Sequence, residues 1–272
     1  MNASTERQFH FHADASPVGG HITHPFEQII TTEASSSLAQ AGGLVTGVHE
    51  SYRLDPIVSA QKAYSHISGA KNHTTGNWTT LTTSVVEFLN VLEVVTADRI
   101  VARLAVEHPK VGYTPRVSFV GVQFINLRVN GHVVHPKINH SPFDTEHGTF
   151  PKQPHVKDEK FLKKVTEHSR RITEAKDAPE WLKARHRWVG TPEEREKRGH
   201  VLCSLVEDIE GVKDAKSHGH VIMVPEFGNL FLGEISVDHG SFALTMIRME
   251  LGCPAVGNLS FASSRSNGLP YP

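Results

Sequence analysis

The 272-residue sequence has few of the features that identify exported or membrane proteins. Its two cysteines, Cys203 and Cys253, cannot form a disulfide framework, and we expect both to be reduced thiols in the core. No run of 18 or more apolar residues could form a membrane-spanning helix. The first ten residues lack the apolar segment of a secretory signal. These absences predict a soluble, cytoplasmic protein that does not contact a membrane.

The sequence also lacks an excess of charge of either sign. It contains 28 lysines and arginines against 29 aspartates and glutamates, and its pI is near 7.0. A balanced chain has no global field that attracts nucleic acid, so we expect no nucleic-acid partner. Histidine, by contrast, is abundant, with 19 copies. Because free imidazoles gain a proton near pH 6, solubility and ligand binding should depend on pH.

Familiar catalytic and nucleotide-binding motifs are absent. The sequence contains no Gly-x-Gly-x-x-Gly, no Walker-type Gly-Lys-Ser/Thr, no Gly-x-Ser-x-Gly and no His-Glu-x-x-His. Nucleotide cofactors, P-loop phosphate chemistry and α/β-hydrolase chemistry are therefore disfavoured. A cysteine–histidine nucleophile stays open, because Cys203 or Cys253 could meet one of many histidines. No catalytic residue is identified.

Residues 1–150 show the composition and turn signals of β-structure. The clearest block lies between Trp78 and Val134, where short β-branched runs end at Gly-, Pro- or Asn-containing breaks. Asn130-Gly131 favours a two-residue hairpin turn, with residues 132–134 as the returning strand. The other strands predicted in this block are 79–92, 99–106, 116–124 and 126–129.

Residues 151–200 have a different pattern and are expected to form a charged helical insert. An amphipathic helix is predicted over 157–175. One stripe of this helix holds Phe161, Leu162, Val165, His168 and Ile172. Thr191 and Pro192 are typical of a further helix N-terminus. Half of all lysines and arginines (14 of 28) fall in the insert, beside nine acids. We interpret it as a solvated helical pair; the alternatives are a basic docking face for an acidic partner or a lid over a pocket.

Beyond Val201 the β pattern resumes, with strands predicted at 219–224, 229–237 and 241–251. Asp238-His239-Gly240 is expected to form a hairpin loop with Gly240 at positive φ. We expect 230–237 to be an edge strand open to pairing, and the tail from Ser263 onward to be irregular.

The fold class that follows is mainly β. We expect a single antiparallel β-sandwich or barrel that spans residues 1–272, with a helical insertion at about 155–200.

The first candidate metal site is the segment from His10 to Asp14. Alternate residues of a strand share one face, so His10, His12 and Asp14 would project together and could bind zinc or another divalent ion. The segment resembles the His-x-His-x-Asp motif of metallo-hydrolases. The alternative is an exposed strand face in a histidine-rich chain.

The second candidate metal site is His218-Gly219-His220, followed by Glu226. It resembles the first motif of cupins, small β-barrels in which a His-x-His and a glutamate lie on adjacent strands. The resemblance implies His218, His220 and Glu226 as ligands of a divalent ion such as zinc or iron. The gaps from Gly211 to His218 and from His220 to Glu226 are one residue longer than in that motif. The alternative is a Gly-rich turn that enters a core strand.

A third resemblance covers residues 95–131. The segments Val95-Thr96-Ala97-Asp98 and Leu127-Arg128-Val129-Asn130-Gly131 are similar to the β-rich unit of bacterial choice-of-anchor surface proteins, whose biochemical role is largely uncharacterised. The resemblance implies an all-β architecture.

The sequence leaves two functions open. Regular strands without a complete catalytic motif favour a β-sandwich that acts through binding a partner or through self-assembly. The alternative is a metal-dependent enzyme that acts on a small molecule, in which a divalent ion held by His-x-His ligands activates a bound water.

Overall fold

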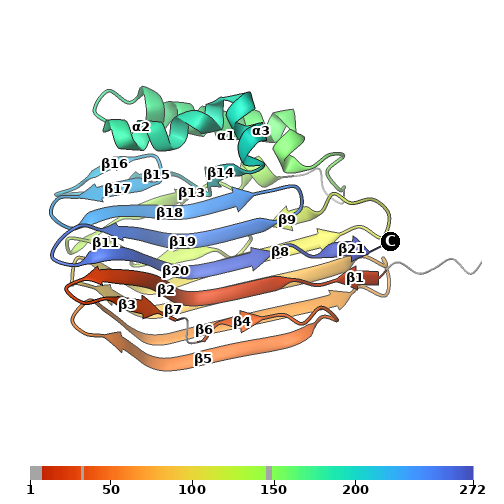
Figure 1. Cartoon of the computed structure of the whole chain (residues 1–272), viewed down its shortest axis with the longest axis horizontal. Helices are drawn as coiled ribbons and strands as arrows, with labels where there is room; N and C mark the ends of the chain where they lie inside the picture. The colour runs from red at the N-terminus through yellow and green to blue at the C-terminus, as the bar shows by residue number, and fades with distance from the viewer. Residues whose placement is uncertain (1–7, 32–33, 145–148, 272) are drawn as a thin grey trace, which may run out of the picture.

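The computed structural model describes residues 8–31, 34–144 and 149–271. Within these ranges, two large antiparallel sheets pack face to face, and the helices lie beside the end of the first sheet that contains β16 and β17 (Figure 1). The strand order of each sheet runs from one edge to another without closing, so the fold is a β-sandwich. The mainly β class with a helical insertion is therefore confirmed.

The first sheet has the order β16 (Lys216–His218), β17 (Val221–Val224), β18 (Gly228–Val237), β19 (Phe242–Leu251), β20 (Val256–Ser266), β2 (Ala13–His24) and β3 (Gln28–Ile30). Two short strands join it: β14 (Val201–Ser204) on β18 and β4 (Ser36–Ser37) on β2.

The second sheet has the order β12 (His132–Val133), β11 (Arg128–Val129), β8 (Val95–His108), β7 (Trp78–Val91), β6 (Val58–Lys71) and β5 (Gly43–Leu54), with β9 (Arg116–Ser118) and β10 (Gln123–Ile125) on β8. Two small sheets pair β1 (Gln8–His10) with β21 (Leu269–Tyr271) and β13 (His135–Ile138) with β15 (Val206–Glu210).

The insert contains α1 (Glu159–Glu174), α2 (Glu180–Arg187) and α3 (Pro192–Arg198), with short 3-10 turns η1 (Ser141–Phe143), η2 (His155–Lys157) and η3 (Trp188–Gly190). Helix α1 begins where the Asp158 carboxylate accepts hydrogen bonds from two backbone amides of the first turn. Its buried stripe contains Phe161, Val165 and Ile172, as predicted. Helix α3 starts at Pro192, also as predicted. No helix of the described residues is long and apolar enough to cross a membrane.

One large hydrophobic cluster joins the two sheets to the insert. It includes Leu104 of β8, Phe261 of β20 and Phe161 of α1, all nearly inaccessible to solvent. A smaller cluster forms the outer side of the first sheet, where Phe231 of β18 packs with Leu182 of α2. The insert therefore rests on apolar contacts with β17 and β18 as well as on the core between the sheets.

A single glycine reverses the side-chain alternation of β18. Leu232 points into the sandwich core, but after Gly233, with φ of 62°, it is Ile235 that does so. A backbone residue with positive φ shifts the phase of a strand by one position, and glycine adopts this conformation without a steric penalty. As a result Phe231 and Glu234 both face the helices, although strict alternation would place them on opposite faces.

Two predictions about the C-terminal half are wrong. The tail is not irregular: residues 263–266 complete β20, and residues 269–271 form β21. Ser264 and Ser266 are buried there, so a polar composition did not indicate a loop. The segment 230–237 is not an edge strand, because β18 pairs with β14, β17 and β19.

Three local predictions are also corrected. Residues 116–124 form two strands, β9 and β10, because Gly121 with φ of 97° turns the chain between them. Gly240 is not among the residues with positive φ; its loop is instead bridged by the Asp238 amide, which donates to the Ser241 carbonyl at 2.9 Å. Both cysteines are free thiols, but only Cys203 is buried, whereas Cys253 is exposed.

Candidate functional site

A buried carboxylate lies where the insert meets the first sheet. Glu234 of β18 accepts a hydrogen bond from Arg185 Nη2 of α2 at 2.9 Å and one from Arg248 Nε of β19 at 2.7 Å. The Glu234 side chain is 7% exposed, so these are charge-assisted bonds in a largely dry environment. Glu234 therefore links the insert to two neighbouring strands.

The two guanidinium groups also share an aromatic platform. Arg248 lies 3.7 Å and Arg185 lies 4.7 Å from the ring centroid of Phe231. Arg248 makes a further ion pair with Glu250 at 2.6 Å. Stacking on a ring lowers the free energy of a buried cation, so Phe231 supports both arginines in the positions that Glu234 requires.

Glu234 is ionised in the folded protein. Burial on its own would raise the pKa of this carboxyl, but His220 and the guanidinium groups of Arg248 and Arg185 hold its pKa well below its ordinary value. The Glu234 carboxylate therefore stays negatively charged in the interface between α2 and the sheet at physiological pH.

Three histidines adjoin this carboxylate. His220 Nε2 lies 3.6 Å from Glu234 Oε1, and His220 Nδ1 lies 3.1 Å from His168 Nε2 of α1. The ring of His186 of α2 meets the ring of His220 edge-on, with centroids 5.3 Å apart. Burial, then the neighbouring His220, lowers the pKa of His168 to about 3 and that of His186 to about 2. Both imidazoles are therefore neutral at pH 7.

A tight turn places His220 under α1. Gly219 and His220 connect β16 to β17, with His218 paired to Val221, and Gly219 has φ of 57°. Positive φ at the first of two loop residues is typical of a type II′ hairpin turn. A Cβ atom at Gly219 would lie 3.0 Å from Ile172 Cδ1 and 3.3 Å from His168 Cε1. Glycine is therefore required both for the turn and for the close approach of α1.

His168 also lines a cleft of about 270 Å³ between α1 and the strands β14 and β15. Across this cleft Arg171 pairs with Glu207 at 2.8 Å, and Asn139 Nδ2 donates to the other oxygen of Glu207 at 3.0 Å. Lys164 Nζ donates to the Ser141 carbonyl at 2.6 Å. The lining residues of the cleft are Asn139, Ser141, Pro142, Lys164, Val165, Glu167, His168, Arg171, Cys203, Ser204 and Glu207.

Cys203 is not an activated nucleophile in this cleft. Burial, reinforced by the negative charge of Glu234, raises the pKa of the Cys203 thiol far above neutrality. The thiol therefore keeps its proton at pH 7, and the cysteine–histidine nucleophile that the sequence left open gains no support at this position. Cys253 is exposed and does not line the cleft.

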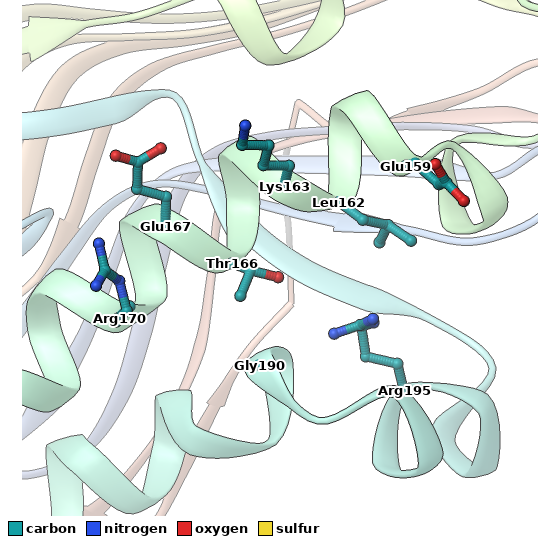
Figure 2. Close-up of a pocket in the computed structure, with 8 residues that line it drawn as sticks. All are labelled: Glu159, Leu162, Lys163, Thr166, Glu167, Arg170, Gly190 and Arg195. Carbon is teal, nitrogen blue, oxygen red and sulfur yellow. The ribbon is translucent and has the colours of Figure 1, made fainter.

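A second, wider groove of about 540 Å³ lies on the outer side of the insert (Figure 2). It runs between α1 and the segment that carries Gly190 and Arg195, and charged side chains of both signs surround it (Figure 2). This groove is open to solvent and is not connected through any described hydrogen bond to the buried cluster. The narrower, less open cleft beside His168 is therefore the better candidate for a specific site.

The first predicted metal segment alternates as expected. His10 and His12 are exposed, while Phe9, Phe11 and Ala13 are buried. His12 Nε2 lies 3.7 Å from Asp14 Oδ2, but His12 is also hydrogen-bonded to the Asn267 side chain. Asp14 accepts a hydrogen bond from the Ser37 hydroxyl at 2.7 Å.

The second predicted metal segment is divided by its turn. Because Gly219 and His220 form the hairpin loop, His218 and His220 do not share one strand face. His218 Nε2 lies 4.0 Å from Asp177 Oδ2, whereas His220 faces Glu234. Glu226 is exposed in the turn between β17 and β18.

The two His-x-His segments are not neighbours. His10 ends β1 and His12 precedes β2, whereas His218 ends β16 and His220 precedes β17. β2 and β17 belong to one sheet, but β18, β19 and β20 lie between them. Among the described residues, no three histidine, cysteine, aspartate or glutamate side chains are placed so that they could hold one metal ion. A metal role for His10, His12, Asp14, His218, His220 and Glu226 stays a prediction.

Most of the buried cluster was missed from the sequence. His168 was expected on the apolar stripe of its helix, and His220 was singled out as a metal ligand. Glu234 had a usable signal, because it is the one charged residue within the largely apolar segment Leu230–Val237. Arg185 had none, because it lies among several other charges, and Arg248 shares the predicted strand 241–251 with one other charged residue, Glu250.

The fold and this cluster define a class: an antiparallel β-sandwich with a helical insert that docks through a buried carboxylate and two arginines. A family model described as a domain of unknown function, DUF8256, matches residues 9–238. The chain therefore belongs to the DUF8256 family. No match was found among curated proteins or among solved structures. Glu234, His168 and Arg185 lie inside the matched range, whereas Arg248 lies beyond it.

Proposed function

We propose that this protein is a binding protein and that it takes up a small polar molecule in the cleft between α1 and β14–β15. The observation that supports the proposal is the position of His168, which lines the cleft and is fixed from behind by His220. A polar lining side chain whose orientation is fixed by a buried hydrogen bond is typical of a preformed binding site.

The dimensions and charges of the cleft limit its ligand. A volume of about 270 Å³ suits a small metabolite rather than a peptide. Arg171 is already paired with Glu207. Lys164 and Glu167 line the same cleft. Neither forms an ion pair with another described residue, although Lys164 donates a hydrogen bond to the Ser141 carbonyl. A positively charged group, the Lys164 ammonium, and a negatively charged group, the Glu167 carboxylate, are therefore available to a ligand at the rim of the cleft.

The setting of the protein is part of the same proposal. Two free thiols, one of them exposed, favour a reducing compartment such as the cytoplasm. The balanced charge of the chain gives no reason to expect nucleic acid as the ligand.

A thermal-shift screen with a matched pair of variants tests the proposal. The probes are a panel of small carboxylates, amino acids, sugars and polyols. Lys164→Ala/Arg171→Ala removes one lysine and one ion-paired arginine from the cleft. Lys163→Ala/Arg170→Ala removes the same two residue types from the outer groove (Figure 2). Arg170 is also ion-paired, to Glu174.

We expect a compound that stabilises the wild-type protein by about 2.7 kcal/mol at a concentration 100 times its Kd. The cleft variant should lose this stabilisation, and the groove variant should keep it. Equal stabilisation of both variants, loss only in the groove variant, or no stabilisation of the wild type by any member of the panel would each contradict the proposal.

A further inference from the structure

Three side chains form a continuous polar chain from the buried carboxylate to the cleft. Glu234 Oε1 lies 3.6 Å from His220 Nε2, and His220 Nδ1 lies 3.1 Å from Nε2 of His168, which lines the cleft. His220 Nε2 is buried and has no hydrogen-bond partner of ordinary length among the described residues. The anionic Glu234 oxygen is the acceptor nearest to it, so electrostatics favours a proton on this nitrogen.

The position of that proton determines the other protons of the chain. A neutral imidazole carries one N–H and one acceptor nitrogen. If His220 is protonated on Nε2, its Nδ1 is an acceptor, and His168 must donate its own Nε2–H across the 3.1 Å contact. His168 Nδ1 is then a lone-pair acceptor. Because Nε2 is occupied by His220, Nδ1 is the ring nitrogen that His168 can offer to a ligand.

The surrounding groups keep His168 neutral. Arg185 of α2, Arg248 of β19 and Arg171 of α1 all lie near the chain, and His186 contacts His220. These neighbours oppose a positive charge on His168, whose pKa is lowered mainly by burial. A neutral imidazole with so low a pKa is a weak base, but it remains a good hydrogen-bond acceptor.

We propose that the Glu234–His220–His168 chain fixes His168 as a hydrogen-bond acceptor and makes the cleft selective for an uncharged ligand with hydroxyl donors, such as a sugar or polyol. This inference rests on the proposed binding function and names its ligand class. A hydroxyl can donate to His168 Nδ1 and also accept from Lys164, whereas a carboxylate has no proton to donate. His168 is thus a specificity-determining residue, and Glu234 and His220 are positioning residues.

The first test needs no ligand. In ¹⁵N-edited NMR spectra at pH 7, assigned by comparison with His168→Gln, we expect both His168 and His220 to carry their proton on Nε2. Glu234→Gln replaces the anion with an amide that can donate to His220 Nε2, so both tautomers should invert. Glu250→Gln, which removes the other carboxylate bound to Arg248, should leave them unchanged.

The wild-type spectrum keeps the proposal falsifiable even if Glu234→Gln fails to fold. An Nδ1–H tautomer or an imidazolium at His168 in the wild type overturns it. If both glutamate variants fold, unchanged tautomers in Glu234→Gln, or inverted tautomers in Glu250→Gln, also overturn it.

The second test uses binding by isothermal calorimetry, with polyol or sugar members of the panel and deoxy analogues that lack single hydroxyls. We expect one deoxy analogue to bind the wild type roughly 10- to 100-fold more weakly, and His168→Phe to abolish this discrimination. Equal affinity of all deoxy analogues, or tighter binding of carboxylates than of polyols, overturns the ligand class. If the NMR spectra show the predicted tautomers but no compound binds at the cleft, the proposed binding function is refuted. The proton arrangement of the Glu234–His220–His168 chain would still stand.

Discussion

The two faces of the first sheet are held by different forces. On the inner face, toward the second sheet, the polar groups are uncharged: Ser264 and Ser266 of β20 are buried, and so are Thr82 and Ser84 of β7. Cα atoms of β20 and β7 come within 8 Å of each other, closer than the ~10 Å usual for stacked sheets, because these side chains are small. On the outer face, toward the insert, the sheet presents Glu234 and Arg248.

The two interfaces differ in how many titratable groups they bury. The hydroxyls and apolar groups between the sheets do not titrate, and the buried imidazole of the sandwich itself is His108 of β8, which packs against Phe9. The interface with the insert contains ionised and neutral titratable groups whose protonation states differ between the folded and unfolded chain. We therefore expect acid and single substitutions to weaken the docking of the insert before they affect the sandwich.

The largest expected effect is that of pH on global stability. Burial lowers the pKa of His108 to about 4, of His155 to about 4 and of His186 to about 2. The unfolded chain binds these protons below about pH 6.5 and the folded chain does not, so stability is complete above pH 6.5 and falls as the pH falls. Each histidine should remove about 2 kcal/mol between pH 7 and pH 5, or about 6 kcal/mol for three.

Urea denaturation at intervals between pH 7 and pH 5 measures this slope. His155→Phe and His108→Phe should each reduce it by about 1 kcal/mol per pH unit, averaged over this range. A free energy of unfolding that stays constant over this range would show that these imidazoles are not held neutral.

The next effect is that of removing the buried carboxylate. Glu234→Ala leaves Arg185 and Arg248 without their shared partner, and we expect a loss of about 3–5 kcal/mol in the free energy of unfolding. Glu250→Ala removes the more exposed partner of Arg248 and should cost under about 1 kcal/mol. Similar losses for the two variants would contradict the account of the interface.

The sequence could predict the elements that carry a periodic signal and not the contacts between them. The strand 79–92 corresponds to β7, and the helix 157–175 corresponds to α1, because alternation and the 3.6-residue period are local properties. The phase shift at Gly233 is not visible in a pattern that treats 229–237 as one regular strand. Glu234 therefore could not be assigned to the face that meets Arg185.

The candidate site illustrates the same limit. His168 was placed on the buried stripe of its helix, and His220 was recognised as unusual, but their contact joins residues 52 positions apart in the sequence. The His-x-His spacing indicated one strand face, whereas the positive φ of Gly219 makes a turn between the two histidines. Which partner a buried imidazole meets is decided by tertiary packing, and a single sequence does not contain that information.

Gly219→Ala tests how closely helix α1 of the insert packs on the turn between β16 and β17. The added methyl group meets Ile172 and His168 and also forces alanine to a φ of 57°. Gly131→Ala is the matched control, because its φ is 77° and nothing lies within 4 Å of the added Cβ. We expect the free energy of unfolding to fall by about 1 kcal/mol in the control, from the unfavourable φ alone, and by about 2–4 kcal/mol in Gly219→Ala. Equal losses in denaturation experiments would mean that the approach of α1 does not depend on Gly219.

The smallest effect is expected inside the sandwich. The Ser264 hydroxyl is buried without a hydrogen-bond partner among the described residues. Replacing it by alanine removes a group that is desolvated but unpaired, so Ser264→Ala should change stability by less than about 1 kcal/mol and can increase it. A loss of 2 kcal/mol or more would show that the sandwich also depends on buried polar bonds.

Native-state hydrogen exchange at pH 7 and pH 5, corrected for intrinsic rates, tests the central claim most directly. Opening of the insert exposes His186 and His168 to protonation, so the free energy of opening of α1 and α2 should fall by about 2 kcal/mol or more between these pH values. Amides of β7 and β19 should exchange only at higher opening free energies at both values. A uniform loss of protection across helices and strands, or no change in α1 and α2, would contradict a separate, titratable interface between the insert and the sandwich.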